Sequence, residues 1–129
     1  MKPAEQANLL LRKALQDQAI LVLLVDDKTI SDDAVGFHAQ QAAEKLLKAL
    51  LAFHQQDYPR SHDLNVLIAL LARIGICLPS GLNLLADLSP LATIYRYEDL
   101  PSDSELPRRE WLAWIAMLRE LVETEIASN

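Results

Sequence analysis

Hydrophobic residues recur with helical spacing through the middle of the chain, from Phe37 onward. On a helical wheel they form one broad apolar face: Ala39, Ala42, Ala43, Leu46, Leu47, Ala49, Leu50 and Phe53. No glycine or proline interrupts residues 37–57. The pattern predicts a long helix that begins after a Ser31 or Asp32 cap and that the Asp57-Tyr58-Pro59-Arg60 stretch ends.

The opposite face of this helix carries a line of polar side chains. Gln41, Glu44 and Lys48 form the line, and Gln40 and Lys45 flank it. The Glu44–Lys48 pair has the favourable i, i+4 order, with the acid first. The line is either a solvated helix face or one wall of a groove. We expect the groove, with Glu44 partly buried against a cation such as Arg96 and the pair sensitive to mutation.

The N-terminal part of the chain predicts another helix, over residues 4–25. Its inner stripe is Ala7, Leu11, Ala14, Leu21 and Val25, and its solvent side is Arg12, Lys13, Gln16 and Asp17. Residues 20–25 are apolar all round, which indicates burial against two neighbours or a contact between subunits. A β-strand is the alternative for this short run.

The remaining periodic segments are shorter, except the last. Ser61 is the expected N-cap of a third helix that Gly75 stops, and Pro79 and Ser80 open a fourth segment. Ser89-Pro90 predicts the start of a short fifth helix that runs to about Tyr97. The final helix spans about residues 108–127, with its inward side chains at Trp111, Ile115, Leu118 and Val122. The pattern as a whole predicts an all-α antiparallel bundle.

Composition agrees with a single domain over residues 1–129, since 51% of the residues are hydrophobic and 5% are aromatic. A net charge of −6 argues against broad, nonspecific binding to nucleic acid. Cys77 is the only cysteine, so no internal disulfide is possible. The longest apolar run, residues 19–25, is too short to cross a bilayer, and no signal-peptide pattern opens the chain. We therefore expect a cytoplasmic protein without a membrane contact.

The residues that most often carry chemistry form no familiar catalytic pattern. His38, His54 and His62 lack metal-ligand spacing, so we expect no metal and no cofactor. His62 is better explained by a hydrogen bond from its ring to another helix. The chain has no glycine-rich loop for a triphosphate and no alternating aspartates on a strand to bind magnesium. We therefore expect no catalysis by this chain alone.

Two aromatic pairs remain as candidates for binding. Tyr95, Arg96 and Tyr97 could stack on a base and hold a phosphate, or they could close the bundle with Arg96 paired to an acid. Both interpretations stay open. Trp111 and Trp114 are three residues apart in the last helix, and core packing explains them better than a stacking surface.

Several of these elements together resemble a known family. The run Phe37-His38-x-Gln40-Gln41-Ala42-x-Glu44-Lys45-x-x-Lys48-Ala49, followed by Tyr58-Pro59-Arg60-Ser61-His62-Asp63-Leu64, resembles the HEPN domains associated with minimal nucleotidyltransferases. The resemblance implies an up-and-down antiparallel four-helix bundle with a short additional helix, similar to the C-terminal domain of kanamycin nucleotidyltransferase. Tyr95-Arg96-Tyr97 stands where the family has alanine-arginine-tyrosine-proline, and Glu98 replaces the proline.

The resemblance also implies a function. It points to a noncatalytic subunit that binds a nucleotide, a substrate or a partner, beside a separate small nucleotidyltransferase and often within a toxin–antitoxin pair. The candidate binding residues are Gln41, Glu44, Lys45, Lys48, His62, Tyr95, Arg96 and Tyr97.

Two alternative functions remain open. Many HEPN domains are ribonucleases with an arginine four to six residues before a histidine, and this chain has no such pair. An atypical ribonuclease that uses His62 with Arg60 or Arg96 is one alternative, and a helical adaptor that only dimerises is the other. We also expect a homodimer, because the bundle has more apolar surface than it can cover.

Overall fold

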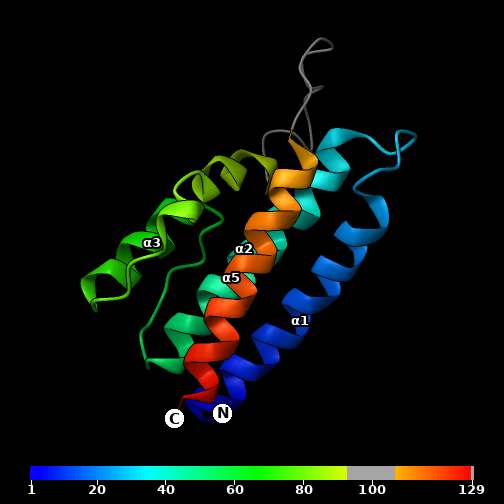
Figure 1. Ribbon diagram of the computed structural model, residues 1–129. Coiled ribbons are helices and arrows are strands. Elements are labelled where there is room, and N and C mark those ends of the chain that lie inside the picture. The colour runs from blue at the N-terminus through cyan, green and yellow to red at the C-terminus, as the bar shows by residue number, and fades with distance from the viewer. Residues whose placement is uncertain (93–106, 129) are drawn as a thin grey trace.

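The computed structural model of the chain describes residues 1–92 and 107–128 (Figure 1). The helices in these ranges are α1 (Pro3–Leu24), α2 (Asp32–Phe53), α3 (Leu64–Arg73) and α5 (Arg108–Ala127), with the 3₁₀ helices η1 (Ser80–Leu82) and η2 (Leu85–Ala92). No strand occurs in the described ranges, so the predicted all-α bundle is confirmed and residues 20–25 are not a strand there. The predicted bounds of the first and last helices are correct to within one residue.

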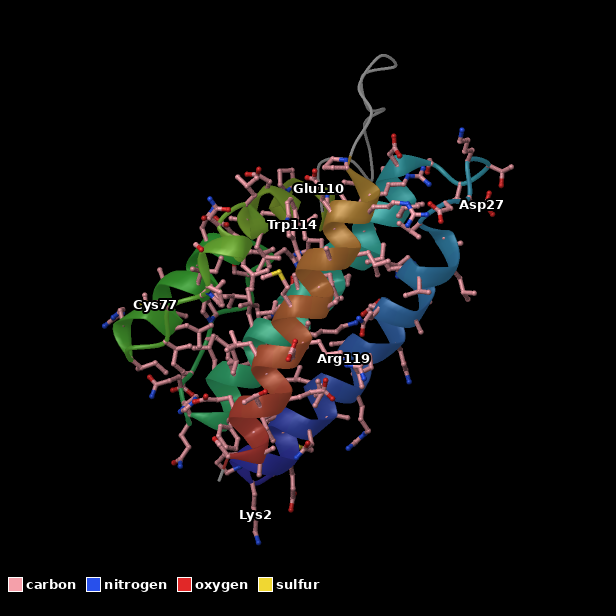
Figure 2. The ribbon with its side chains drawn as sticks, viewed as in Figure 1. Lys2, Asp27, Cys77, Glu110, Trp114 and Arg119 are labelled. Atoms are coloured by element: carbon pink, nitrogen blue, oxygen red, sulfur yellow. The ribbon has the colours of Figure 1, made fainter. Side chains whose placement is uncertain are left out.

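Helix α2 lies at the centre of the bundle, with α1 and α5 beside it (Figure 1). α1 packs against α2 along most of its length, through small buried side chains that let the backbones approach: Ala7 and Ala14 from α1, and Ala39, Ala42, Ala43 and Ala49 from α2. α5 runs antiparallel to α1, and Arg119 in its middle donates to Gln18 on α1 at 2.9 Å (Figure 2). Its buried residues are the four predicted ones, Trp111, Ile115, Leu118 and Val122.

Helix α2 ends earlier than its sequence predicts. Its last residue is Phe53, and Gln55 adopts a left-handed backbone with φ of 58°. The Gln55 N–H then donates to the Ala52 carbonyl, and the Gln56 N–H donates to the Leu51 carbonyl at 2.9 Å. These two bonds form a Schellman motif, which reverses the chain four residues before the expected stop near Asp57.

After this reversal the chain runs back along α2. Residues 54–63, here termed the return segment, contain no helix or strand. The segment leaves the end of α2 at His54 and brings His62 beside Gln40 and Glu44. The return segment therefore covers the polar face of α2.

Helix α3 begins at a different cap from the one predicted. The N-cap is Asp63, whose carboxylate accepts the Asn65 N–H at 3.0 Å, and Ser61 lies outside the helix. The first N–H of α3, that of Leu64, donates to the Ser89 hydroxyl at 2.9 Å. Ser89 and Pro90 lie within η2, which begins at Leu85, and residues 93–97 of the predicted fifth helix lie outside the described residues. Gly75 ends α3 with φ of 85°, as predicted.

Arg108 joins the start of α5 to the loop between α1 and α2. Its guanidinium donates to the Asp32 carboxylate at 2.6 Å and to the backbone carbonyls of Leu24, Asp27 and Ile30. Leu24 is the last residue of α1, and its carbonyl accepts hydrogen bonds both from the Asp27 N–H at 3.0 Å and from Arg108 at 3.4 Å. This contact fixes the top of the three long helices relative to one another.

The apolar end of α1 remains partly uncovered. Leu21 and Val25 are buried, but the side chains of Val22 and Leu23 are 54% and 78% exposed. Of the two explanations that the sequence offers for this apolar run, burial against two neighbours does not hold for Val22 and Leu23, and a contact between subunits stays a prediction. None of the described helices combines the length and the apolar character that a membrane span requires.

Candidate functional site

The polar line on α2 is covered by the return segment and does not face solvent. Gln40 is fully buried, and Glu44 is 5% exposed. Gln41, Lys48 and His62 complete the group, which we term the α2 cluster: Gln40, Gln41, Glu44, Lys48 and His62. The structure thus brings four of the eight predicted site residues together: Gln41, Glu44, Lys48 and His62.

Glu44 is the centre of the α2 cluster. One carboxylate oxygen accepts hydrogen bonds from His62 Nδ1 at 2.8 Å and from Gln40 Nε2 at 3.1 Å. The other oxygen accepts from Lys48 Nζ at 3.0 Å. The burial expected of Glu44 is confirmed, and its partners are Lys48 and His62, whereas Arg96 lies outside the described residues.

This environment keeps Glu44 ionised. Burial alone raises the pKa of a carboxyl group, but the hydrogen bonds from His62, Gln40 and Lys48 outweigh burial and hold the pKa of Glu44 below its ordinary value of 4.5. An ionised carboxylate can only accept hydrogen bonds. Every donor around it must therefore present a hydrogen, His62 included.

His62 is held in one tautomer as a result. Its Nδ1 carries the hydrogen that Glu44 accepts, so Nε2 of the neutral ring has a free lone pair. Gln40 Nε2 also donates to the His62 carbonyl at 3.0 Å, which fixes the backbone as well as the ring. The ring bonds to another helix as predicted, although His62 precedes the α3 cap and does not lie in the first turn of α3. The side chain is 57% exposed, so Nε2 is accessible.

Two residues that contact the predicted site residues, Gln40 and Tyr58, were not themselves predicted as site residues. Gln40 links Gln41, Glu44 and His62, since its amide oxygen accepts from Gln41 Nε2 at 2.7 Å. The Lys48 ammonium lies 5.6 Å from the centre of the Tyr58 ring, a cation–π contact with the return segment. In the sequence analysis Gln40 appears only on the flank of the polar line and in the family resemblance, and Tyr58 appears only in the stretch that ends the helix and in that resemblance.

Lys45 does not join the α2 cluster. It lies 100° around the helix from Glu44 and turns to α1, where its ammonium binds the Asp17 carboxylate at 2.5 Å. His38 Nδ1 approaches the same carboxylate at 3.1 Å. Asp17 is buried, so its predicted place on the solvent side of α1 is wrong. A buried carboxylate is tolerated there because two groups from α2 pair with it.

A hollow of about 740 Å³ opens beside His62. It is lined by Arg60 and His62 of the return segment, Asn65 of α3, and Asp87 and Pro90 of η2. The volume suits a small organic ligand. We term this space the His62 hollow.

A second hollow, of about 600 Å³, lies at the start of α5 beside Asp26, Lys28 and Arg108. The Arg108 guanidinium is occupied by its four internal contacts, and Arg109 pairs with Asp26. This hollow therefore offers no group as well oriented as His62.

The other predicted residues lie elsewhere or outside the described ranges. Tyr95, Arg96 and Tyr97 fall outside them, so their two interpretations stay predictions. Trp111 is buried, and Trp114 packs against the core from a partly buried position on α5 (Figure 2). Within residues 1–92 and 107–128, no three His, Cys, Asp or Glu side chains are grouped closely enough to hold a metal ion.

Comparison with known proteins gave one match. A protein-family model described as HEPN domain matches residues 7–126 of the 129-residue chain. The matched range includes α2, the return segment and the whole α2 cluster. Searches of curated proteins and of solved structures gave no match.

Proposed function

The chain belongs to the HEPN domain family, and from that premise we propose that it is a noncatalytic binding subunit that acts with a separate small nucleotidyltransferase. In this role the chain binds the nucleotide or the acceptor, and the partner supplies the catalytic aspartates. The pair could operate as a toxin and its antitoxin.

The observation that carries the proposal is the hydrogen bonding of the Glu44 carboxylate, because both of its oxygens accept hydrogen bonds from other side chains of the protein. A buried carboxylate that accepts from three side chains is a positioning group, because its oxygens are already occupied. Within the α2 cluster the imidazole of His62 is the exposed side chain, and Arg60 lines the same hollow. Such an arrangement supports recognition of a ligand and lacks the metal-binding acids that nucleotidyl transfer needs.

Within this proposal the predicted residues have distinct roles. Gln41, Glu44 and Lys48 position His62 from inside the bundle, and His62 contacts the ligand. Lys45 stabilises the contact between α1 and α2 and is not a binding residue.

Co-expression with the product of the neighbouring reading frame tests this function. We expect the two chains to purify together, and we expect nucleotide transfer from the complex and none from this chain alone. Absence of a complex, or nucleotide transfer by the isolated chain, would contradict the proposal.

A second candidate function, ribonuclease activity, is favoured by one feature of the same site. A carboxylate–imidazole pair with a free Nε2 is able to transfer protons, as a general base or acid does. The usual arginine–histidine spacing of HEPN ribonucleases is absent, so we expect no cleavage of total RNA by the purified chain. Cleavage that is lost in His62→Asn would replace the first function with this one.

A further inference from the structure

We propose that the return segment lifts from the polar face of α2 as one unit while the helices stay folded, and that Glu44 is the group that holds it closed. The inference goes beyond the proposed function, because it concerns the isolated chain and is tested without any partner protein. It rests on how residues 54–63 are attached to the bundle: by a few polar contacts and one partly buried tyrosine.

The return segment buries little of its own surface. None of its ten residues is buried, and seven of them are exposed. Within the described part of the chain, Tyr58 is the one side chain of the segment that packs against the hydrophobic core. The next element, α3, instead buries Leu64, Leu67 and Leu71. Because the free energy of a local opening rises with the apolar area that it exposes, the return segment should open more readily than α3 leaves the core.

The main chain of the return segment is attached chiefly at its two ends. Gln55 turns the chain at the end of α2, and Asp63 caps α3. Between them, in the described ranges, the main chain of residues 57–62 makes one hydrogen bond to the bundle, in which the His62 carbonyl accepts from Gln40 Nε2 at 3.0 Å. The middle of the segment can therefore lift while both anchored ends stay in place.

The side-chain contacts that hold the segment closed converge on Glu44. One oxygen of its carboxylate accepts from His62 Nδ1 at 2.8 Å and from Gln40 Nε2 at 3.1 Å. The other oxygen accepts from Lys48, whose ammonium lies 5.6 Å from the centre of the Tyr58 ring. All of these groups are polar, so water can replace their hydrogen bonds once the segment lifts. Opening is therefore a hydration of polar groups and exposes little of the leucine core.

Opening of the return segment also takes apart the His62 hollow. Arg60 and His62 line the hollow from the segment, and Asp87 lines it from η2, so the space exists only while the segment is closed. The apparent affinity of a ligand that contacts the segment falls in proportion to the closed fraction. Glu44 thus controls the hollow from inside the bundle, although its own carboxylate is buried.

Trypsin cleavage of the full chain at the Arg60–Ser61 bond tests the inference, with the rate at each bond measured by mass spectrometry. A protease needs an extended segment of chain, so this bond is cut when the return segment is open. The Lys13–Ala14 bond, in the middle of α1, is the reference for global unfolding. We expect cleavage after Arg60 to be at least about tenfold faster and to respond little to urea below the unfolding transition, whereas cleavage after Lys13 rises steeply with urea.

Two neighbouring residues of α2 separate local opening from global unfolding. Glu44→Gln should speed cleavage after Arg60 at least about tenfold, because the charge that holds His62 and Lys48 is lost. Lys45→Gln is the matched control, since it breaks the pair with Asp17 away from the return segment. It should speed cleavage after Lys13 and leave cleavage after Arg60 within about twofold of the wild type.

Should Glu44→Gln fail to fold, His62→Ala removes the contact from the other side, with its rate taken relative to that of a peptide of residues 54–66. Equal acceleration at both bonds in Lys45→Gln would show that the segment opens only when the whole bundle unfolds. That result, or a cleavage rate after Arg60 that neither Glu44→Gln nor His62→Ala raises, would overturn the inference.

Discussion

At the scale of single residues, Glu44 explains why polar side chains can occupy the inside of α2. A buried carboxylate is unfavourable unless hydrogen bonds replace its water, and here His62, Gln40 and Lys48 replace it. In the described ranges no buried side-chain nitrogen or oxygen is left without a partner. Every buried polar side-chain atom of the α2 cluster therefore has a hydrogen-bond partner. Replacing one residue of the cluster leaves buried polar atoms of the others without a partner, which lowers the free energy of unfolding.

Glu44→Gln should lower the free energy of unfolding by about 2–4 kcal/mol, because the glutamine amide has one acceptor oxygen and therefore leaves either Lys48 or His62 without its acceptor. Lys48→Met should also destabilise, and the double variant should lose less than the sum, with a coupling of about 1–3 kcal/mol. Chemical denaturation of the four proteins measures this. Small and additive losses would mean that the Glu44–Lys48 pair contributes no more than an exposed one.

The lowered pKa of Glu44 predicts how stability changes with pH. Since the folded pKa lies below the ordinary value of 4.5, the contribution is fully present above that pH and is lost as the pH falls through the folded pKa. The melting temperature of the wild type should therefore fall more steeply than that of Glu44→Gln between about pH 6 and pH 3. Parallel curves for the two proteins would contradict the assignment.

At this scale the sequence correctly predicted those contacts of the candidate site that join two residues one turn apart on the same helix. The i, i+4 rule was enough to pair Glu44 with Lys48. It could not place His62, which is 18 residues from Glu44 and meets it only because Gln55 turns the chain back. Asp17 was misplaced for a similar reason, since its partners Lys45 and His38 lie on another helix.

At the scale of elements, the helices with strong end signals were predicted correctly. Pro3 in the first turn of α1 and Gly75 after α3 fix those ends by their own backbone preferences. The end of α2 was missed because Gln55, a residue with no intrinsic preference for a left-handed backbone, occupies that position. Ser89 looked like a local cap in the sequence but caps α3 from a distance.

Arg108 should matter more to stability than its neighbour Arg109. Arg108→Lys cannot reproduce the fork that reaches Asp32 and three carbonyls, so we expect a loss of about 2–3 kcal/mol. Arg109→Lys is the matched control, since its pair with Asp26 is exposed and should change stability by less than about 0.5 kcal/mol. Equal losses in thermal melts of the two variants would show that Arg108 does not join the helices.

At the scale of the whole molecule, the uncovered end of α1 predicts self-association. Val22 and Leu23 expose apolar surface next to the buried Leu21, and exposed apolar patches favour protein contacts. We expect a homodimer in sedimentation at about tens of micromolar, and a monomer for Leu23→Asp. Leu84→Asp, which changes an exposed leucine elsewhere, should stay dimeric. A monomeric wild type would contradict the prediction.

The whole fold brings three elements to one place: α2 holds Glu44, the return segment brings His62 to it, and residues of η2 line the same hollow as His62. The ¹⁵N spectrum of the histidine side chains tests this arrangement. In the neutral ring of His62 we expect a protonated Nδ1 and an unprotonated Nε2, and Glu44→Ala, which leaves no side-chain acceptor, should remove this preference. A His62 ring protonated on Nε2 in the wild type would mean that Glu44 does not orient it, and the site proposed for this HEPN domain would be wrong.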